Sequence, residues 1–368
     1  MTYKHLFARA LAAAPERLHF AAHSHHLWPD ASRDGQEEAW EDGVRLADRK
    51  WDKVMGPIWA EAQREIAAEL CLPDPATICF APNTHELAVR LVSALAAETP
   101  RILATTGEFH AFRRQAQRWH EAGRIELVEV APENLLASAR RGGFDLVFAS
   151  HVAFSTGQVL PGLENLAALA APDGPWIAID GYHAFMATPV DLSAMAERVF
   201  YLGGGYKYAM SGEGAAFIHA PPSFAARPVF TGWYAAFDDL AALPGHVGYA
   251  PDGRRFLGST FDPSGLYRFV HVRRRLAREE LTTAKISAHC DALKARFAAA
   301  GLLGNYTQIA DPQARFLAFK GERAAALHAA LMERHVITDV RGDVLRIGFG
   351  LYQDADDVDR LIAILRAA

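Results

Sequence analysis

The sequence has little cysteine. Its three cysteines, Cys71, Cys79 and Cys290, are odd in number and far apart in a chain of 368 residues. Disulfide frameworks are typical of small secreted domains in which cysteines are frequent and even in number. The pattern therefore argues against a disulfide framework and indicates a reducing compartment.

Long apolar runs are also lacking. The alanine-rich start of the chain, residues 1–18, is interrupted by Arg9 and Glu16, and its apolar segment is too weak for a signal peptide or a membrane span. We interpret it as an N-terminal helix. We therefore expect a cytoplasmic protein that makes no contact with a membrane.

Neither sign of charge is in large excess. The formal net charge is −5, with 22% charged and 51% hydrophobic residues, so the protein has no general attraction to nucleic acid or to anionic membranes. The run RRRLAREEL, which begins at Arg273, mixes signs at helical spacing and is typical of a solvated helix face. We predict one or two globular domains and no nucleic-acid partner.

Histidine, by contrast, is crowded in one place. The stretch LHFAAHSHHLWPD, residues 18–30, carries His23, His25 and His26, which suggests a metal site. Side chains this close together in an irregular segment cannot all point at one ion, and the spacing fixes no further ligand elsewhere. A metal-dependent hydrolase built on these histidines is therefore a remote alternative, and we predict no bound metal.

Short apolar runs alternate with amphipathic helices through the middle of the chain. This alternation predicts an α/β fold with a mostly parallel sheet flanked by helices, followed by a smaller α+β domain. The predicted strands are residues 101–106, 124–130, 145–150, 176–180, 198–203 and 215–220. The helices between them are predicted at residues 110–123, 133–141 and 163–171.

The regions on either side of this block are different in character. Apolar residues recur at helical spacing over 33–70, with a break at Gly56-Pro57, and one long helix is predicted over 263–300. Directly after the α/β block, residues 221–255 are rich in Pro, Gly and aromatics, which predicts a long structured connection to this helix. We predict an N-terminal arm that contributes to the small domain and the active site, a large α/β domain and a small α+β domain, at residues 1–45, 46–255 and 256–368.

Three individually weak signals occur in sequence order. Asn83 and Glu86 begin a helix, either as an ordinary cap or so that its free amides, with the Thr84 hydroxyl, hold a phosphate. Asp180 ends an apolar strand, where it could cap a helix or pair with a cationic ring nitrogen. Lys207 lies between two strands in GGGYKYAMSGEG, either as an exposed turn lysine or as a Schiff-base lysine with a lowered pKa. Together they predict a site for pyridoxal 5′-phosphate (PLP).

Five further stretches carry a resemblance to a known family. They are FSTGQVLP, AIDGYHA, YKY, TGWYAAF and VLRIGFGLYQDADDV, which begin at residues 154, 178, 206, 231 and 344. With them the chain resembles the fold-type I, PLP-dependent enzymes of the class V aminotransferase group, and within that group it is most similar to kynureninase. The resemblance covers nearly the whole chain and places cofactor binding in the large domain.

This resemblance implies roles on the cofactor side. Lys207 would form the Schiff base and later move protons, Asp180 would keep the pyridine nitrogen protonated, and His183 would lie near the ring hydroxyl. Phe109, rather than His110, would stack on the cofactor ring. The remaining cofactor contacts, some of them across a homodimer interface, are assigned to Asn83, Thr84, Thr156, Tyr206, Trp233, Ser259 and Thr260.

The same resemblance implies a substrate side that departs from the family. Arg346 would clamp the substrate α-carboxylate with two parallel hydrogen bonds. The N-terminal segment resembles the kynureninase stretch Asn-Ser-Leu-Gly-Leu-x-Pro, but it begins with His23, Ser24, His25 and His26 instead of Asn, Ser, Leu and Gly. Because this stretch lines the substrate side in these enzymes, we assign Ser24, His25 and His26 to substrate binding.

Kynureninase-like chemistry would hydrolyse the Cβ–Cγ bond of a 3-acyl-alanine, giving alanine and an acid. Tyr206 or a histidine of the N-terminal cluster would supply the acid-base step. Transamination remains open because it needs the same lysine, aspartate and arginine. A desulfurase is disfavoured, since Cys290 lies in a helix pattern rather than on a reactive loop. A catalytically silent PLP-binding protein is disfavoured by the intact Lys207, Asp180 and Arg346.

Overall fold

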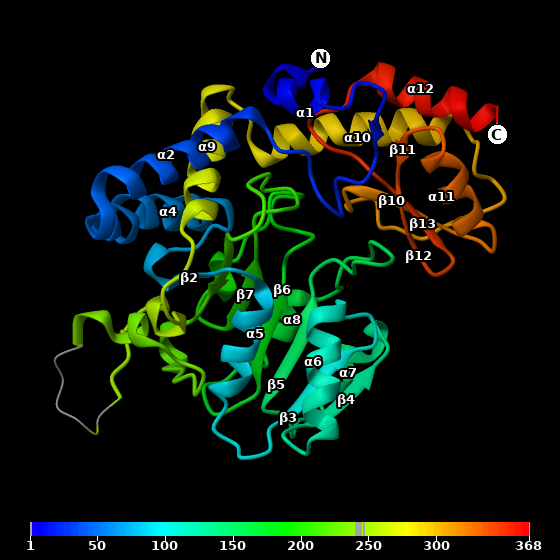
Figure 1. Ribbon diagram of the computed structural model, residues 1–368. Helices are drawn as coiled ribbons and strands as arrows, with labels where there is room; N and C mark the ends of the chain where they lie inside the picture. Colours follow the sequence, from blue (N-terminus) through cyan, green and yellow to red (C-terminus); the bar gives the residue numbers. More distant parts are fainter. Residues whose placement is uncertain (1, 240–244, 246, 368) are drawn as a thin grey trace.

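The large sheet has seven strands. The computed structural model describes residues 2–239, 245 and 247–367, and the strand order is β2-β8-β7-β6-β5-β3-β4 (Figure 1). β8 is antiparallel to both neighbours, whereas the other pairs are parallel. The strands are β2 Ile78–Ala81, β3 Arg101–Thr105, β4 Glu126–Val130, β5 Leu146–Ser150, β6 Trp176–Asp180, β7 Val199–Gly203 and β8 Ala216–His219. The predicted mostly parallel α/β sheet is confirmed.

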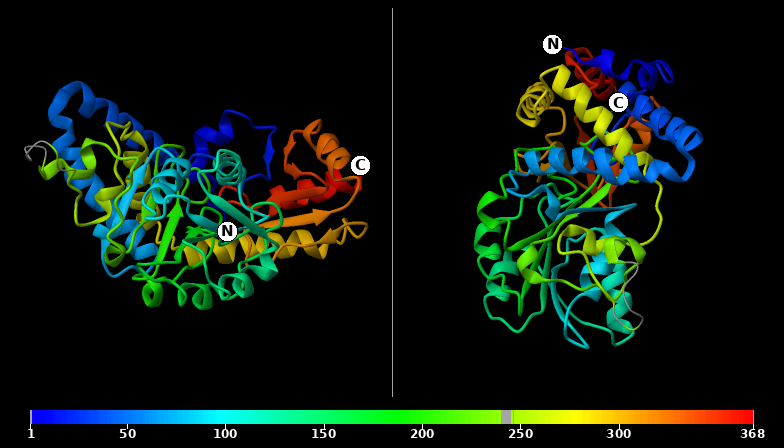
Figure 2. Two further views of the ribbon diagram at one scale, coloured as in Figure 1. Left: turned by 90° about the horizontal axis from the view of Figure 1, so that it is seen from below. Right: turned by 90° about the vertical axis from the view of Figure 1, so that its left-hand side faces the viewer.

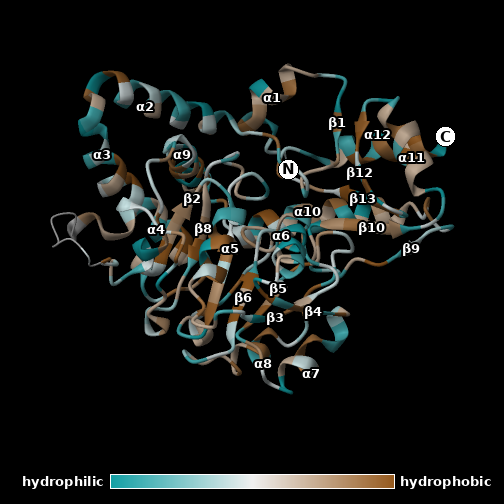
Figure 3. Cartoon of the chain, turned by 60° about the horizontal axis from the view of Figure 1, so that its bottom comes forward, coloured by the Kyte–Doolittle hydropathy of each residue, from teal (hydrophilic) through white to brown (hydrophobic). Residues whose placement is uncertain are grey.

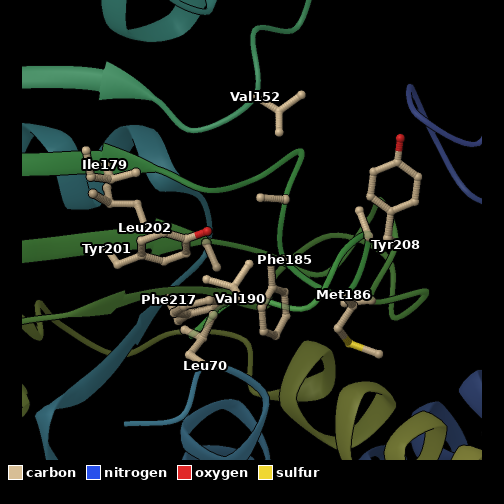
Figure 4. Packing of buried hydrophobic residues seen from close by; sticks show 14 of the residues in the cluster. Leu70, Val152, Ile179, Phe185, Met186, Val190, Tyr201, Leu202, Tyr208 and Phe217 are labelled. Carbon is tan, nitrogen blue, oxygen red and sulfur yellow. The ribbon is translucent and has the colours of Figure 1, made fainter. Parts of the chain in front are cut away.

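Helices cover this sheet, and its inner strands are continuous apolar runs because both of their faces are buried. Only the edge strand β4 is half exposed. The covering helices are α5 Thr84–Ser93, α6 His110–Glu121, α7 Leu135–Ala139 and α8 Leu163–Ala167. Figure 3 shows the hydrophobic strands inside and the mainly hydrophilic α6 outside. Within the core, the Phe185 ring packs edge-on against Phe217 of β8, with centroids 4.8 Å apart (Figure 4).

The N-terminal region is helical apart from one short strand. Its elements are α1 Ala8–Ala12, β1 Leu18–His19, α2 Asp30–Leu46, α3 Lys50–Lys53, a π-helical turn Val54–Ile58 and α4 Trp59–Glu69. Gly56 departs from helical geometry, as the predicted break at Gly56-Pro57 requires. A second break, at Ala47 with φ of 52°, was not predicted. None of the helices in the described chain is long and apolar enough to cross a membrane.

The predicted single helix over 263–300 is wrong. It consists of α9 Ser264–Arg278 and α10 Thr283–Ala299, separated where Glu280 adopts a left-handed φ of 53°. The Thr282 side chain accepts a hydrogen bond from the Lys285 amide and begins the second helix. The predicted connection 221–255 contains only short 3-10 turns among its described residues, and residues 240–244 and 246 lie outside them.

A second, antiparallel sheet of order β12-β13-β10-β9 forms the C-terminal part. Its elements are β9 Thr307–Gln308, β10 Phe316–Lys320, α11 Ala324–Met332, β11 Val336–Ile337, β12 Asp339–Arg341, β13 Val344–Gly348 and α12 Ala355–Arg366. β11 lies outside this sheet and pairs with β1 in parallel. The N-terminal segment therefore lies against the C-terminal elements, as Figures 1 and 2 show in blue beside orange and red.

Candidate active site

Lys207 follows β7 and is buried, with 5% of its surface exposed. Its Nζ lies 4.6 Å from the ring centroid of Tyr182, 4.7 Å from that of Tyr206 and 5.4 Å from that of Phe109. Burial lowers the pKa of this lysine to about 8, while the Asp180 carboxylate acts in the opposite direction. About a tenth of Lys207 is therefore a neutral amine at pH 7, far more than for an ordinary lysine, and this is the nucleophilic form.

The glycines before Lys207 are required by close packing. A Cβ at Gly204 would lie 2.4 Å from the Tyr182 hydroxyl, and a Cβ at Gly205 would lie 2.6 Å from the Gly212 carbonyl oxygen. Side chains at these positions would push the turn away from Tyr182 and from the loop at Gly212. The glycine run therefore holds Lys207 inside the protein, and the exposed-turn alternative for this lysine is wrong.

Asp180 ends β6, next to the strand that leads into Lys207. It does not cap a helix: its Oδ1 accepts a hydrogen bond of 2.9 Å from the Tyr182 amide in the following turn. Burial raises the pKa of this carboxyl, and the nearby Lys207 charge acts against that rise. The structure therefore brings the predicted acid and the predicted lysine together at the carboxyl edge of the sheet.

Buried polar atoms without partners surround Lys207. Within the described chain, His183 Nδ1, both ring nitrogens of His23 and Arg346 Nε have no hydrogen-bond partner. Burial lowers the pKa of both histidines well below its usual value, with the Lys207 and Arg346 charges adding to the effect. Because buried polar groups are normally hydrogen bonded, this set fits a polar group held between them. PLP, with its ring hydroxyl and phosphate, has that chemistry.

Glu108 is a buried acid that the sequence did not reveal as part of the site. Its carboxylate oxygens accept hydrogen bonds from Thr105 at 2.5 Å and from Ser150 at 2.7 Å. Burial raises the pKa of Glu108 to about 7, with the Asp180 charge contributing further. Thr105, Ser150 and Asp180 end three neighbouring strands, so the only sequence signal was an acid shortly after a strand.

An aromatic wall closes one side of the site. The Phe109 ring faces Lys207 and packs edge-on against Phe154, with centroids 5.3 Å apart. His110, the residue we disfavoured for stacking, is exposed and lies 5.0 Å from the same Phe154 ring. Tyr182 belongs to this wall as well, although we did not predict it, since its ring contacts both Lys207 and Tyr206.

Arg346 is almost fully buried, with 2% of its surface exposed. Its guanidinium donates to the Phe154 carbonyl and to Oδ2 of Asp339. Asp339 lies directly opposite on β12, and its other oxygen forms an ion pair of 2.7 Å with Arg341. The predicted carboxylate clamp is therefore already paired with an acid of the protein, which the sequence gave no reason to expect.

The three N-terminal histidines have separate surroundings. The His23 ring stacks on Phe316 at 4.7 Å and the exposed His25 ring stacks on Tyr206 at 5.0 Å. His26 is buried: its ring packs against those of Phe7 and Tyr352, its Nδ1 bonds to the Leu27 carbonyl, and only its backbone amide reaches the Tyr206 carbonyl. No three His, Cys, Asp or Glu side chains gather as a metal site in the described ranges.

Of the predicted substrate residues, His25 thus lies beside Tyr206, and Ser24 contacts His25, with Ser24 Oγ 3.3 Å from His25 Nδ1. The His26 side chain is directed into the packing of the N-terminal region. The residue of this cluster that borders the buried centre is His23, which we had not assigned to the substrate. It lies 4.0 Å from Asp339.

The predicted phosphate end is organised around α5. Asn83 accepts a bond of 2.9 Å from the Glu86 amide, but the Glu86 carboxylate pairs with Arg90 at 2.7 Å, so only half of the capping box forms. Thr84 is the first residue of this helix. A cavity of about 300 Å³ beside it is lined by Pro82, Glu86, Arg90, Ser259 and Thr260, among others.

The last two predicted cofactor residues are less central. Trp233 is partly exposed, and its ring lies on Tyr234 with centroids 4.1 Å apart. The Thr156 hydroxyl accepts a hydrogen bond of 3.3 Å from the Gln158 amide in the loop after Phe154. Neither contact joins these residues to Lys207 within the described structure.

Known proteins resemble this chain in sequence and in fold. Residues 283–365 match the family model of the kynureninase C-terminal domain. Isopenicillin N epimerase of Streptomyces clavuligerus is 28% identical over 337 residues, 83% of each chain. A C-DES mutant with glycine covalently linked to the PLP cofactor has a TM-score of 0.83 at 19% identity, over 99% of each chain. Cysteine desulfurase of Thermococcus onnurineus NA1 has a TM-score of 0.79 at 16% identity, over 100% of this chain and 99% of that one.

The fold is therefore that of the fold-type I PLP-dependent enzymes. Together with this fold and the buried Lys207, the sequence matches indicate a PLP-dependent enzyme that is similar to the class V aminotransferase group. The match to the kynureninase model covers the C-terminal part, which includes Arg346.

Proposed function

We propose that the protein hydrolyses the Cβ–Cγ bond of a 3-acyl-alanine, as a kynureninase does. The observation that carries this proposal is the contact of 3.3 Å between Lys207 Nζ and the Tyr206 hydroxyl, next to the aromatic wall. It places two proton carriers together, and the proposed reaction moves protons at two positions of the substrate, Cα and the side-chain carbonyl oxygen. The kynureninase model match over residues 283–365 supports the same reading.

The residues present fit PLP. Lys207, Asp180, His183 and Phe109 would hold its ring, and the start of α5 at Asn83 and Thr84 would hold its phosphate. We also propose that the cofactor is contacted by Thr156, Trp233, Ser259 and Thr260. When bound, PLP withdraws electrons from the Cα of an amino acid.

Each side chain then has a defined task. Lys207, with its pKa near 8, removes the proton from the substrate Cα and later returns it. Burial raises the pKa of Tyr206 to about 12, so its hydroxyl stays protonated and can hold a proton at the side-chain carbonyl oxygen. Water adds to that carbonyl carbon and the Cβ–Cγ bond breaks. Cβ keeps the electron pair of that bond and takes up a proton, so that the products are alanine and a carboxylic acid.

The relatives suggest other reactions on the same scaffold. Desulfuration needs a reactive cysteine, but Cys290 is buried on α10, where burial raises the pKa of its thiol. Transamination uses the same lysine, acid and arginine, so it remains the alternative to hydrolysis. Epimerisation and C–S cleavage are reactions named for isopenicillin N epimerase and for the cystine lyase C-DES.

The test is a product assay of the PLP-loaded protein. Kynurenine and 3-hydroxykynurenine are each incubated with it, and alanine and anthranilate-type acids are measured. The hydrolase proposal expects equal amounts of alanine and acid. Exchange of amino groups between an amino acid and a 2-oxo acid, without either product, would overturn it in favour of transamination. Isopenicillin N and cystine serve as comparison substrates.

We further propose a homodimer in the cytoplasm. Several large apolar side chains of the connection after β8 are exposed, namely Val229, Phe230, Trp233, Phe237 and Val247. A patch of this kind is typical of an interface, and the scattered free cysteines fit a reducing compartment. Light scattering should give twice the chain mass of 40.3 kDa. A monomer at micromolar concentration would contradict the dimer.

A further inference from the structure

A polar pocket lies beside the candidate active site. It is a cavity of about 350 Å³ between the N-terminal segment and the C-terminal elements, which run side by side in Figure 1. Its lining consists of His19, Ala21, Ser24, His25, His328, Ile337, Thr338, Asp339, Val340 and Arg341. Only three of these side chains are aliphatic, and the lining contains no Phe, Tyr or Trp, so the pocket is suited to a polar group.

The β12–β13 hairpin determines the charge of this pocket. Asp339 and Arg341 are two residues apart on β12 and therefore share a face, and Arg346 lies opposite Asp339. The Asp339 carboxylate forms an ion pair with Arg341 through one oxygen and with Arg346 through the other. Two guanidinium groups thus share one carboxylate, which leaves the group with a net positive charge. Arg341 is partly exposed at the pocket.

The histidines of the pocket add hydrogen-bonding groups that are held in place. His19 Nδ1 lies 2.6 Å from the Tyr352 hydroxyl, and His328 Nδ1 lies 2.8 Å from the Thr338 hydroxyl. His25 Nε2 lies 3.9 Å from the exposed Glu213 carboxylate at the rim. Apart from Asp339, which two arginines neutralise, no acidic side chain belongs to the lining.

Two contacts connect the pocket to the reacting groups. His25 stacks on Tyr206, whose hydroxyl contacts Lys207. Asp339 is bonded to Arg346, the proposed clamp for the α-carboxylate. A substrate bound between Lys207 and Arg346 therefore has this pocket within reach of its side chain.

We propose that the pocket between the N-terminal segment and the β12–β13 hairpin binds a distal carboxylate of the substrate, with Arg341 as the main contact. The substrate is then an amino acid with an acidic side chain, a 3-acyl-alanine whose acyl group carries a carboxylate in place of a neutral aryl ring. This inference rests on the proposed function for the position of the reacting atoms. It differs from that proposal in the group that is recognised.

The test compares two amino acids that differ only in the distal group. Binding of 2-aminoadipate and of its uncharged counterpart, 2-aminohexanoate, to the PLP-loaded protein is measured by calorimetry. The expected result is about ten-fold or more tighter binding of 2-aminoadipate, because a charge-assisted hydrogen bond is made only there. Arg341→Gln should remove this preference. Arg334→Gln, which changes an exposed arginine outside the pocket lining, should keep it.

Three outcomes would overturn the inference: equal binding of the two amino acids, a preference that survives in Arg341→Gln, or an equal loss in Arg334→Gln. Urea unfolding of both variants checks that each is folded. Because binding is measured without turnover, the result is separate from the product assay. A preference for 2-aminoadipate without hydrolysis of any acyl-alanine would contradict the proposed reaction and support the pocket assignment.

Discussion

The two sides of the candidate site are built differently. The sheet wall, defined as Asp180, Tyr182, Tyr206 and Lys207, comes from the ends of two adjacent strands and the turns that follow them. The arm wall, defined as His23, Asp339 and Arg346, is assembled from opposite ends of the chain. In the function that we propose, the sheet wall would act on any amino acid held by PLP, whereas the charges of the arm wall would distinguish one amino acid from another.

This difference suggests a division of labour. A site at the carboxyl edge of a parallel sheet is fixed by the sheet itself, so its chemistry is hard to alter without losing the reaction. The arm wall depends on the pairing of β1 with β11 and of β12 with β13. Changes there should affect stability and substrate preference rather than the chemical step.

The largest expected effect comes from the sheet wall. Lys207→Ala removes the amine that we propose both bonds the cofactor and carries the proton, so turnover should fall by about 10³-fold or more. The visible absorbance band that borohydride bleaches in the wild type should be absent. Lys320→Ala, at an exposed lysine of β10, is the matched control. A bleachable band that persists in Lys207→Ala would place the cofactor lysine elsewhere.

On the arm wall, the largest effect should be on stability. Asp339→Asn leaves the buried Arg346 without its charged partner, and breaking one side of a buried ion pair costs about 3–5 kcal/mol. Urea unfolding at pH 7 should show this loss. Arg341→Gln, which removes the exposed partner of the same acid, should cost roughly 1 kcal/mol or less. Equal losses in the two variants would mean that Arg346 is not the group that needs Asp339.

The sequence predicted the residues of the sheet wall better than those of the arm wall. Apolar runs between helices predicted the large sheet, and strand ends predicted Asp180 and Lys207, because these signals are local. The pairing of Asp339 with Arg346 depends on the register of the β12–β13 hairpin, which could not be predicted from the sequence. The same holds for Tyr182, whose role comes from a turn that folds back over Lys207.

The N-terminal histidines show the same limit. Their separate environments depend on contacts with Phe316, Tyr206 and Tyr352, which lie far away along the chain. Crowding in the sequence therefore did not mean crowding in space. The predicted helix over 263–300 failed for a related reason, since one left-handed residue and one capping threonine divide a continuous apolar pattern.

Glu108, which bonds to Thr105 and Ser150 at the strand ends, can be tested by the pH dependence of stability. Its folded pKa of about 7 lies above its ordinary value of 4.5, so the folded state holds a proton that the unfolded state has released between these values. Stability should therefore fall as pH rises from 4.5 to 7, by roughly 3 kcal/mol for this group. Glu108→Gln should lack this loss and be more stable than the wild type at pH 8.

The measurement for Glu108 is the free energy of unfolding in urea at several pH values, with the cofactor-free protein. Glu126→Gln, on the exposed edge strand β4, should retain the wild-type pH profile. The idea fails if Glu108→Gln retains that profile as well. Such a result would mean that Thr105 and Ser150 stabilise the carboxylate rather than the protonated acid.

The smallest effect on stability, and the sharpest on specificity, is expected at His25. Its side chain is exposed, and its stacking on Tyr206 and its contacts with Ser24 and Glu213 lie at the surface, so His25→Leu should change the free energy of unfolding by less than about 0.5 kcal/mol. Leucine keeps an apolar surface against the Tyr206 ring but cannot hydrogen bond to an acidic substrate. The variant should therefore keep its kcat and raise KM for an acidic amino acid, with little change in KM for a neutral one. If kcat falls for both substrates alike, His25 acts on the proton carried by Tyr206, and the division between the two walls does not hold at this residue.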